Sequence, residues 1–233
     1  MNRCVFFAMA LLSVPLYADV AIYIPGWLKC HAPTSAAPQR IQRLAPSGTF
    51  LYYDWDGNRT WGASLRNAEL EAERLAGELM RLDDAALEKI TIVGHSLGAR
   101  IAVRALAQIS RHGRRIRKAY LLGAAIACDD ADIEAAMYGT KRGIVFVCNG
   151  SEFTLAVLYS SWFAENEKAL GVEEPAKLAN GSRTIWVEPQ DIRDARIPAL
   201  WGKFAPFRKI AAHHAMFYAT ALARYLESGT FAW

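Results

Sequence analysis

Short apolar segments alternate with longer amphipathic segments along this chain, and this alternation constrains the fold more than any other feature. Residues 61–82 carry apolar side chains at steps of three and four, which predicts a helix with one buried face. Further helices are expected at 99–110 and 214–226. The expected strands are 20–24, 49–53, 90–93, 119–122, 143–147 and 184–187. Apolar strands separated by helices predict an α/β fold, with a mostly parallel, twisted sheet covered by helices on both faces.

Composition and charge are those of a globular protein. The chain has 233 residues, of which 53% are hydrophobic and 21% charged, so residues 19–233 are expected to form a single domain with a large core. The net charge of +4 is small. Its one concentrated basic run, 111–118, lies between an expected helix and an expected strand, and we interpret it as a solvated helix end and strand entry. No nucleic-acid partner is expected, because such proteins gather more basic charge on one face.

The first eighteen residues have the layout of a secretory signal peptide. Arg3 is followed by a mostly apolar run over 4–16, and cleavage is expected after Ala18. The run is short for a membrane span. We therefore expect export to a periplasmic or secreted location, with an uncleaved N-terminal membrane anchor as the alternative.

The sequence Gly94-His95-Ser96-Leu97-Gly98 stands directly between an expected strand and an expected helix. A serine hydroxyl becomes a good nucleophile only when it is exposed, aligned and paired with a base. In a G-x-S-x-G turn, glycines relieve crowding where the strand enters the helix, and the serine projects at the top. Ser96 is therefore the expected nucleophile. The backbone N–H of Leu97, at the positive end of the next helix, is an expected oxyanion donor.

With this motif in this context, the chain resembles the α/β-hydrolase superfamily, in particular its lipases and esterases. The resemblance implies a second oxyanion N–H from the loop after an early strand, which is often written His-Gly. Pro25 replaces the histidine here, and the N–H of Trp27 or Leu28 is the expected donor. It also implies that acid and histidine follow the nucleophile, in that order.

The expected base is a histidine near the C-terminus. His213 and His214 follow Ser96 at a suitable distance, whereas His112 lies in the basic run close behind the nucleophile helix. In similar lipases the histidine often precedes an aromatic residue by three positions, as His214 precedes Phe217. His214 is favoured, and His213 stays the alternative.

The expected acid is Glu152, because it follows the apolar segment 143–147 at a place where similar hydrolases usually keep Asp. Other carboxylates also follow expected strands, and an acid of this kind must orient the imidazole. These alternatives are Asp129, Asp130, Asp191 and Asp194.

These features together predict a serine hydrolase, esterase- or lipase-like, that acts on a small ester or lipid through Ser96, Glu152 and His214. No metal or cofactor motif is present in the sequence, and none is implied. Five aromatic residues could line an acyl pocket, touch lipid at a membrane surface or belong to the core: Trp162, Phe163, Trp201, Phe204 and Phe207. Three cysteines of the expected mature chain, Cys30, Cys128 and Cys148, allow at most one internal disulfide. The rival function is that of a non-catalytic binding protein on the same scaffold.

Overall fold

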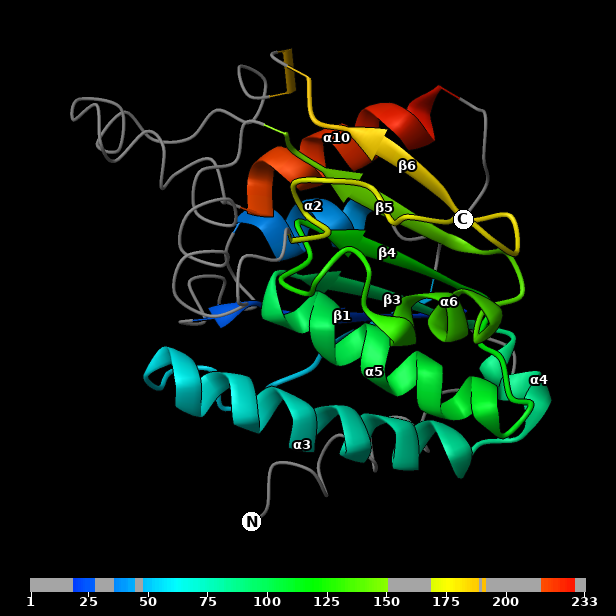
Figure 1. Cartoon of the computed structure of the whole chain (residues 1–233). Coiled ribbons are helices and arrows are strands. Elements are labelled where there is room, and N and C mark those ends of the chain that lie inside the picture. Colours follow the sequence, from blue (N-terminus) through cyan, green and yellow to red (C-terminus); the bar gives the residue numbers. More distant parts are fainter. Residues whose placement is uncertain are drawn as a thin grey trace.

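The computed structural model describes residues 19–27, 36–44, 48–150, 169–188, 190–191 and 215–228. Its centre is one six-stranded sheet in the order β2-β1-β3-β4-β5-β6, in which every neighbouring pair is parallel (Figure 1). The strands are β1 (Asp19–Ile24), β2 (Gly48–Tyr52), β3 (Ile90–His95), β4 (Lys118–Leu122), β5 (Ile144–Cys148) and β6 (Arg183–Trp186). The prediction of a parallel sheet is confirmed.

The register brings the carboxyl ends of the central strands together at one edge. Ile24 of β1 is paired with Gly94 of β3, and His95 of β3 is paired with Leu122 of β4. Every residue of β3, β4 and β5 is buried, as expected for strands covered on both faces. Ligands of open parallel sheets bind outside these carboxyl ends, so this edge is where a functional site is expected.

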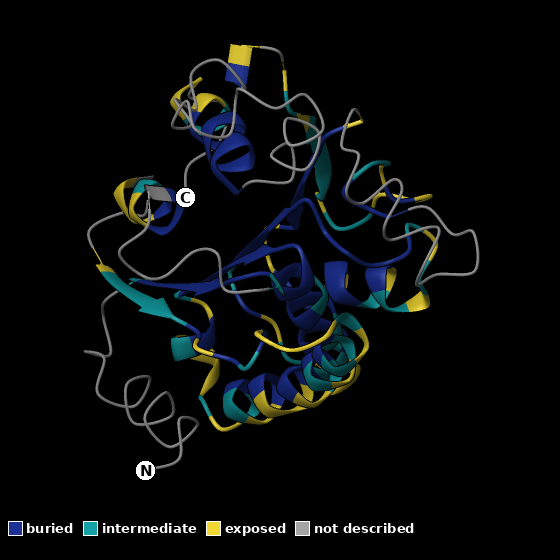
Figure 2. Cartoon of the chain, turned by 90° about the vertical axis from the view of Figure 1, so that its left-hand side faces the viewer, coloured by how far each residue is buried: buried dark blue, intermediate teal, exposed yellow. Residues whose placement is uncertain are grey.

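Helices cover both faces of the sheet, as the alternation predicts. On one face lie α3 (Trp61–Met80), α4 (Asp84–Leu87), α5 (Leu97–Arg111) and α6 (Ala131–Tyr138), and on the other lie α2 (Ala36–Leu44) and α10 (Ala215–Glu227) (Figure 1). Successive strand residues serve the two layers in turn: Ile92 packs toward α3 and α5, and Val93 packs toward α10. The four central strands, β1, β3, β4 and β5, lie buried between these layers, whereas the edge strands β2 and β6 are partly exposed. Exposed residues follow the outer side of α3 (Figure 2).

Three of the described helices were not expected from the sequence. Helix α4 has only four residues and begins where Asp83 accepts a hydrogen bond from the N–H of Ala86. Helix α6 begins in the same way at Asp130, and Pro38 stands in the first turn of α2. Such short helices depend on capping and tertiary packing more than on periodicity.

The basic run 111–118 leads from the end of α5 to the start of β4, as expected, but it is solvated only in part. Arg111 and Arg115 are exposed, but Lys118 begins β4 with 3% of its surface exposed. Burial, together with nearby arginines, lowers the pKa of Lys118 to about 8. Among the described residues, no helix is long and apolar enough to cross a membrane.

Candidate active site

Ser96 occupies a strained turn between β3 and α5. Its φ of 54° and ψ of −121° lie in a region that side-chain-bearing residues rarely adopt. The turn is tight on both sides of the serine. A Cβ atom on Gly98 would lie 2.2 Å from the carbonyl oxygen of Ile24, and one on Gly94 would lie 2.7 Å from the Cα of Ala99. Only glycine fits at these two positions, so the pentapeptide forms the expected strand–elbow–helix unit.

Backbone hydrogen bonds from the next strand hold this strained turn. The N–H of Ser96 donates to the carbonyl oxygen of Leu122, at the end of β4, over 3.0 Å. The carbonyl oxygen of Ser96 accepts from the N–H of Ala99 at 3.0 Å and from the N–H of Ala125 at 3.2 Å. Strain of this kind persists only where the surroundings over-determine the conformation, and here bonds to the end of β4, to the loop after it and to the first turn of α5 do so.

The loop after β1 lies directly against the nucleophile. A Cβ atom on Gly26 would stand 2.8 Å from the Cβ of Ser96 and 3.1 Å from Nδ1 of His95. Backbone at Gly26 therefore approaches Ser96 more closely than any side chain would permit. Trp27, a predicted oxyanion donor, is the next residue of this loop, whereas Leu28 lies outside the described residues.

Leu97 is the first residue of α5, and its N–H group belongs to the helix terminus, where no carbonyl of the helix can accept it. Among the described residues, no other backbone carbonyl accepts it either. The N–H at this position and the positive end of the helix dipole together suit a developing oxyanion next to Ser96.

Two indole N–H groups attach the loop after β1 to the loop between β2 and α3. Nε1 of Trp55 donates to the carbonyl oxygen of Pro25 over 2.8 Å in the buried interior, and Nε1 of Trp27 donates to the carbonyl oxygen of Arg59 over 2.8 Å. The ring of Trp27 also packs edge-on against Trp61, with the ring centroids 5.3 Å apart. Trp55 cannot be singled out from the sequence, because no local pattern indicates a partner 30 residues away.

The predicted base and acid lie outside the described residues. His213 and His214 directly precede α10, and Glu152 follows the described segment that ends at Gly150. These assignments stay predictions. The start of α10 is described, and Tyr218 in its first turn packs against His95, with the two ring centroids 5.9 Å apart. Tyr218 also lies close to Gly123, where a Cβ would be 2.5 Å from the tyrosine ring.

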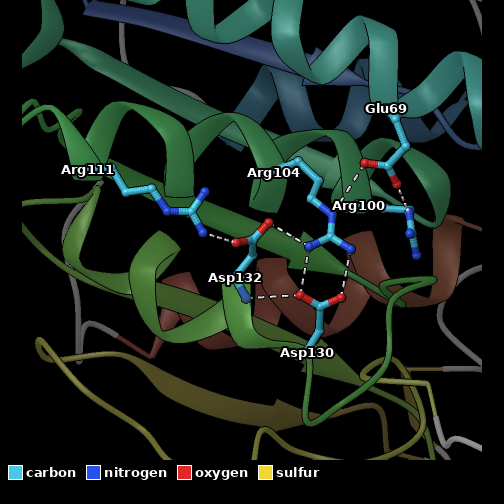
Figure 3. Close-up of polar contacts among 6 residues, drawn as sticks. All are labelled: Glu69, Arg100, Arg104, Arg111, Asp130 and Asp132. Atoms are coloured by element: carbon cyan, nitrogen blue, oxygen red, sulfur yellow. Dashed lines mark hydrogen bonds and ion pairs between the residues drawn. The ribbon is translucent and has the colours of Figure 1, made fainter.

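The two alternative acids after β4, Asp129 and Asp130, have different surroundings. Asp130 caps α6 and binds Arg104 through both carboxylate oxygens, each over 2.8 Å (Figure 3). Arg104 also pairs with Asp132 at 2.5 Å and with Glu69 at 3.4 Å. The Asp130 carboxylate thus belongs to an ion-pair network between α3, α5 and α6. Asp129 is exposed.

Asp191 is also engaged elsewhere. It is 1% exposed, and both of its carboxylate oxygens accept from Arg224 over 3.0 Å. It also accepts from the N–H of Glu188 over 2.7 Å. Arg224 lies nine residues beyond Ala215, about 13.5 Å along the helix axis, so this carboxylate serves the far end of α10. Asp194 lies outside the described residues.

Two cysteines lie within the described residues. Cys128 and Cys148 form no disulfide with each other, and burial raises the pKa of the Cys148 thiol to about 12, which keeps it protonated. Cys30 lies outside the described residues, as do the five aromatic residues of the expected acyl pocket: Trp162, Phe163, Trp201, Phe204 and Phe207. Within the described ranges, no group of three or more potential ligands could hold a metal ion.

Several solved structures are similar to this chain at low sequence identity. A lipase-esterase related protein from Clostridium acetobutylicum is 10% identical, with a TM-score of 0.47 over 92% of this chain and 96% of that one. The type II thioesterase YbtT of the yersiniabactin pathway is 16% identical, with a TM-score of 0.43 over 85% and 94%. An esterase from Pyrobaculum calidifontis is 11% identical, with a TM-score of 0.40 over 96% and 94%. No protein-family model and no curated protein matches the sequence.

Proposed function

We propose that this chain, which has an α/β-hydrolase fold, is a serine hydrolase that cleaves carboxylic esters through Ser96. The observation that carries the proposal is the conformation of Ser96 at the end of β3, with φ at 54° and the backbone of Gly26 packed against its Cβ. A serine in such an elbow presents its hydroxyl at the carboxyl edge of the sheet, next to backbone donors.

The proposed reaction uses three side chains and two backbone groups. His214 takes the proton of the Ser96 hydroxyl while the serine oxygen attacks the ester carbonyl, and Glu152 orients the imidazole. The N–H of Leu97, with that of Trp27 or Leu28, stabilises the oxyanion of the tetrahedral intermediate. His214 then returns the proton to the departing alcohol, which leaves an acyl-enzyme. Water, deprotonated by the same histidine, releases the acid and restores the serine.

The proposed substrate is a small ester or a lipid ester, and the mechanism requires no metal or cofactor. Engagement of Asp130 with Arg104, and of Asp191 with Arg224, supports Glu152 as the acid, because these two alternatives already have strong partners. The close packing of Tyr218 on His95 supports His214, because the first turn of α10 approaches the nucleophile turn.

Labelling with a fluorophosphonate tests this function. The wild-type protein should label at Ser96 and hydrolyse p-nitrophenyl esters, and Ser96→Ala should do neither while its melting temperature stays close to that of the wild type. Ser110→Ala, at the opposite end of α5, is the matched control and should label normally. A wild-type protein that neither labels nor hydrolyses any ester of the series would favour a non-catalytic binding protein.

We also propose that the mature protein begins at Asp19 and is located outside the cytoplasm. The charged and apolar pattern of residues 1–18 supports this. N-terminal sequencing of protein from a periplasmic or culture-medium fraction should give Asp-Val-Ala. Recovery of the full-length chain from the soluble cytoplasm would contradict export.

A further inference from the structure

We infer that Trp55 and Trp27 act together as positioning residues for the oxyanion hole, an inference that rests on the proposed function. We call these two side chains, with their acceptors Pro25 O and Arg59 O, the indole clamp. It holds the loop after β1, whose Gly26 backbone lies against the side chain of Ser96.

The need for a clamp follows from Gly26. No side chain fits at this position, since a Cβ would stand 2.8 Å from the Cβ of Ser96. Glycine, however, is the residue with the greatest backbone freedom, so it does not by itself fix the direction of the next peptide N–H. Pro25 has no N–H with which to anchor the loop. The conformation of this loop must therefore be fixed by contacts on either side of Gly26.

The indole clamp supplies one contact on each side. The Trp55 Nε1–H fixes the Pro25 carbonyl, and because the peptide bond is planar it also fixes the N–H of Gly26. The Trp27 Nε1–H fixes the residue that follows Gly26. Trp55 is 1% exposed, and without its N–H the buried Pro25 carbonyl would lose a partner. The two anchors thus bracket the flexible residue.

The loop between β2 and α3, which carries Trp55 and Arg59, is itself attached to α3. The Ser64 hydroxyl donates to the carbonyl oxygens of Gly57, at 3.2 Å, and Arg59, at 3.3 Å. Nδ2 of Asn67 donates to the carbonyl oxygen of Asp56 over 2.8 Å, and the Asp56 carboxylate pairs with Arg59 at 2.6 Å. Gly57 lies close to the Trp55 ring, since a Cβ there would come within 2.9 Å of it. The clamp therefore connects the oxyanion loop to the rigid helix layer.

An isosteric exchange at Trp55 tests the clamp. Benzothienylalanine has sulfur in place of the indole N–H, so it keeps the ring volume and loses the donor. Removal of a whole oxyanion donor lowers kcat by about 10²–10³. A donor that is displaced but still present should lower kcat less than a donor that is removed. We therefore expect kcat to fall about tenfold, with KM unchanged within about twofold. Rates are divided by the concentration of active sites titrated with fluorophosphonate, and Trp186→Phe, at an exposed tryptophan of β6, is the control.

A second readout separates positioning from general stability. A trifluoromethyl ketone forms a hemiketal oxyanion with the serine, so its affinity should fall by the same factor as kcat/KM, which a merely structural role would not produce. Trp27→Phe removes the other indole N–H, which is partly exposed, and should lower both kcat/KM and the affinity for the ketone. This variant keeps the test available if the Trp55 variants fail to fold.

The outcomes distinguish the clamp from the proposed function. An active wild type whose Trp55 and Trp27 variants keep wild-type kcat per titrated site would overturn the clamp and leave the hydrolase intact. A loss confined to melting temperature or to the number of active sites would overturn it as well. A wild type that neither labels nor hydrolyses esters would overturn both.

Discussion

Gly26→Ala is the substitution that tests the architecture of the site most directly. The new Cβ would stand 2.8 Å from the Cβ of Ser96, whereas carbon atoms in contact prefer about 3.5–4.0 Å. The nucleophile and the oxyanion loop must therefore separate by about 1 Å. Neither partner moves freely, because Ser96 is held by Leu122 and the loop by Trp55.

A misplacement of 1 Å between a nucleophile and its positioning groups can cost about 10²-fold in rate. We expect kcat of Gly26→Ala to fall by about that factor, with a smaller change in KM, since the displaced groups act on the transition state more than on the bound ester. Overpacking should also cost about 1–3 kcal/mol of unfolding free energy. The assay is hydrolysis of a p-nitrophenyl ester per titrated active site, together with thermal melting.

Gly77→Ala is the matched control for this experiment. Gly77 is an exposed residue of α3, and a Cβ there would meet nothing within 4 Å. Alanine should stabilise the helix by about 0.5–1 kcal/mol and leave kcat unchanged. A Gly26→Ala enzyme with kcat within about threefold of the wild type would refute the proposed approach of the loop to Ser96.

Three further predictions concern the acid and base, the ion-pair network and the buried lysine. His214→Ala should lower kcat nearly as much as Ser96→Ala, and His213→Ala should lower it less. Glu152→Gln should lower kcat by about 10⁴-fold. A larger loss of kcat in His213→Ala than in His214→Ala would make His213 the base. Asp130→Asn should lower the melting temperature, because it weakens the pair with Arg104, but should leave kcat unchanged, whereas a large loss of kcat would make Asp130 the acid. The pKa of Lys118 is lowered to about 8 in the folded protein against about 10.4 for an unfolded lysine, so the unfolded chain binds more protons at this site between these values, and the contribution of Lys118 to stability rises with pH across that window. The raised pKa of the buried Cys148 thiol acts in the opposite direction. In denaturant titrations the change in unfolding free energy from pH 8 to 10.5 should therefore be more positive for the wild type than for Lys118→Met, and an equal change in the two proteins would refute the role of Lys118.

The sheet could be predicted from the sequence because buried parallel strands are continuous apolar runs, and all six expected strands are present within two residues of their expected bounds. Ser96 could be predicted because its chemistry requires glycines at fixed positions in the same short turn. Trp55 could not, since its partner Pro25 is distant in the sequence and an indole near a strand end has no characteristic pattern. The carboxylates after the strands were ambiguous for a physical reason: Asp130 caps a helix and binds an arginine, and both roles place Asp where a catalytic acid would also stand.

The two halves of the site are held by different parts of the fold, which makes their contributions separable. The β4 end fixes Ser96, through Leu122 and Ala125, and these bonds maintain the strained elbow. The loop before α3 fixes the oxyanion loop, through Trp55 and Arg59. Substitutions that weaken the bonds to Leu122 and Ala125 should lower the fraction of protein that reacts with fluorophosphonate, because the turn at the nucleophile relaxes. Substitutions that remove the indole hydrogen bonds should leave that fraction unchanged and lower kcat per active site. In that case the serine stays in place, but the stabilisation of the transition state is lost.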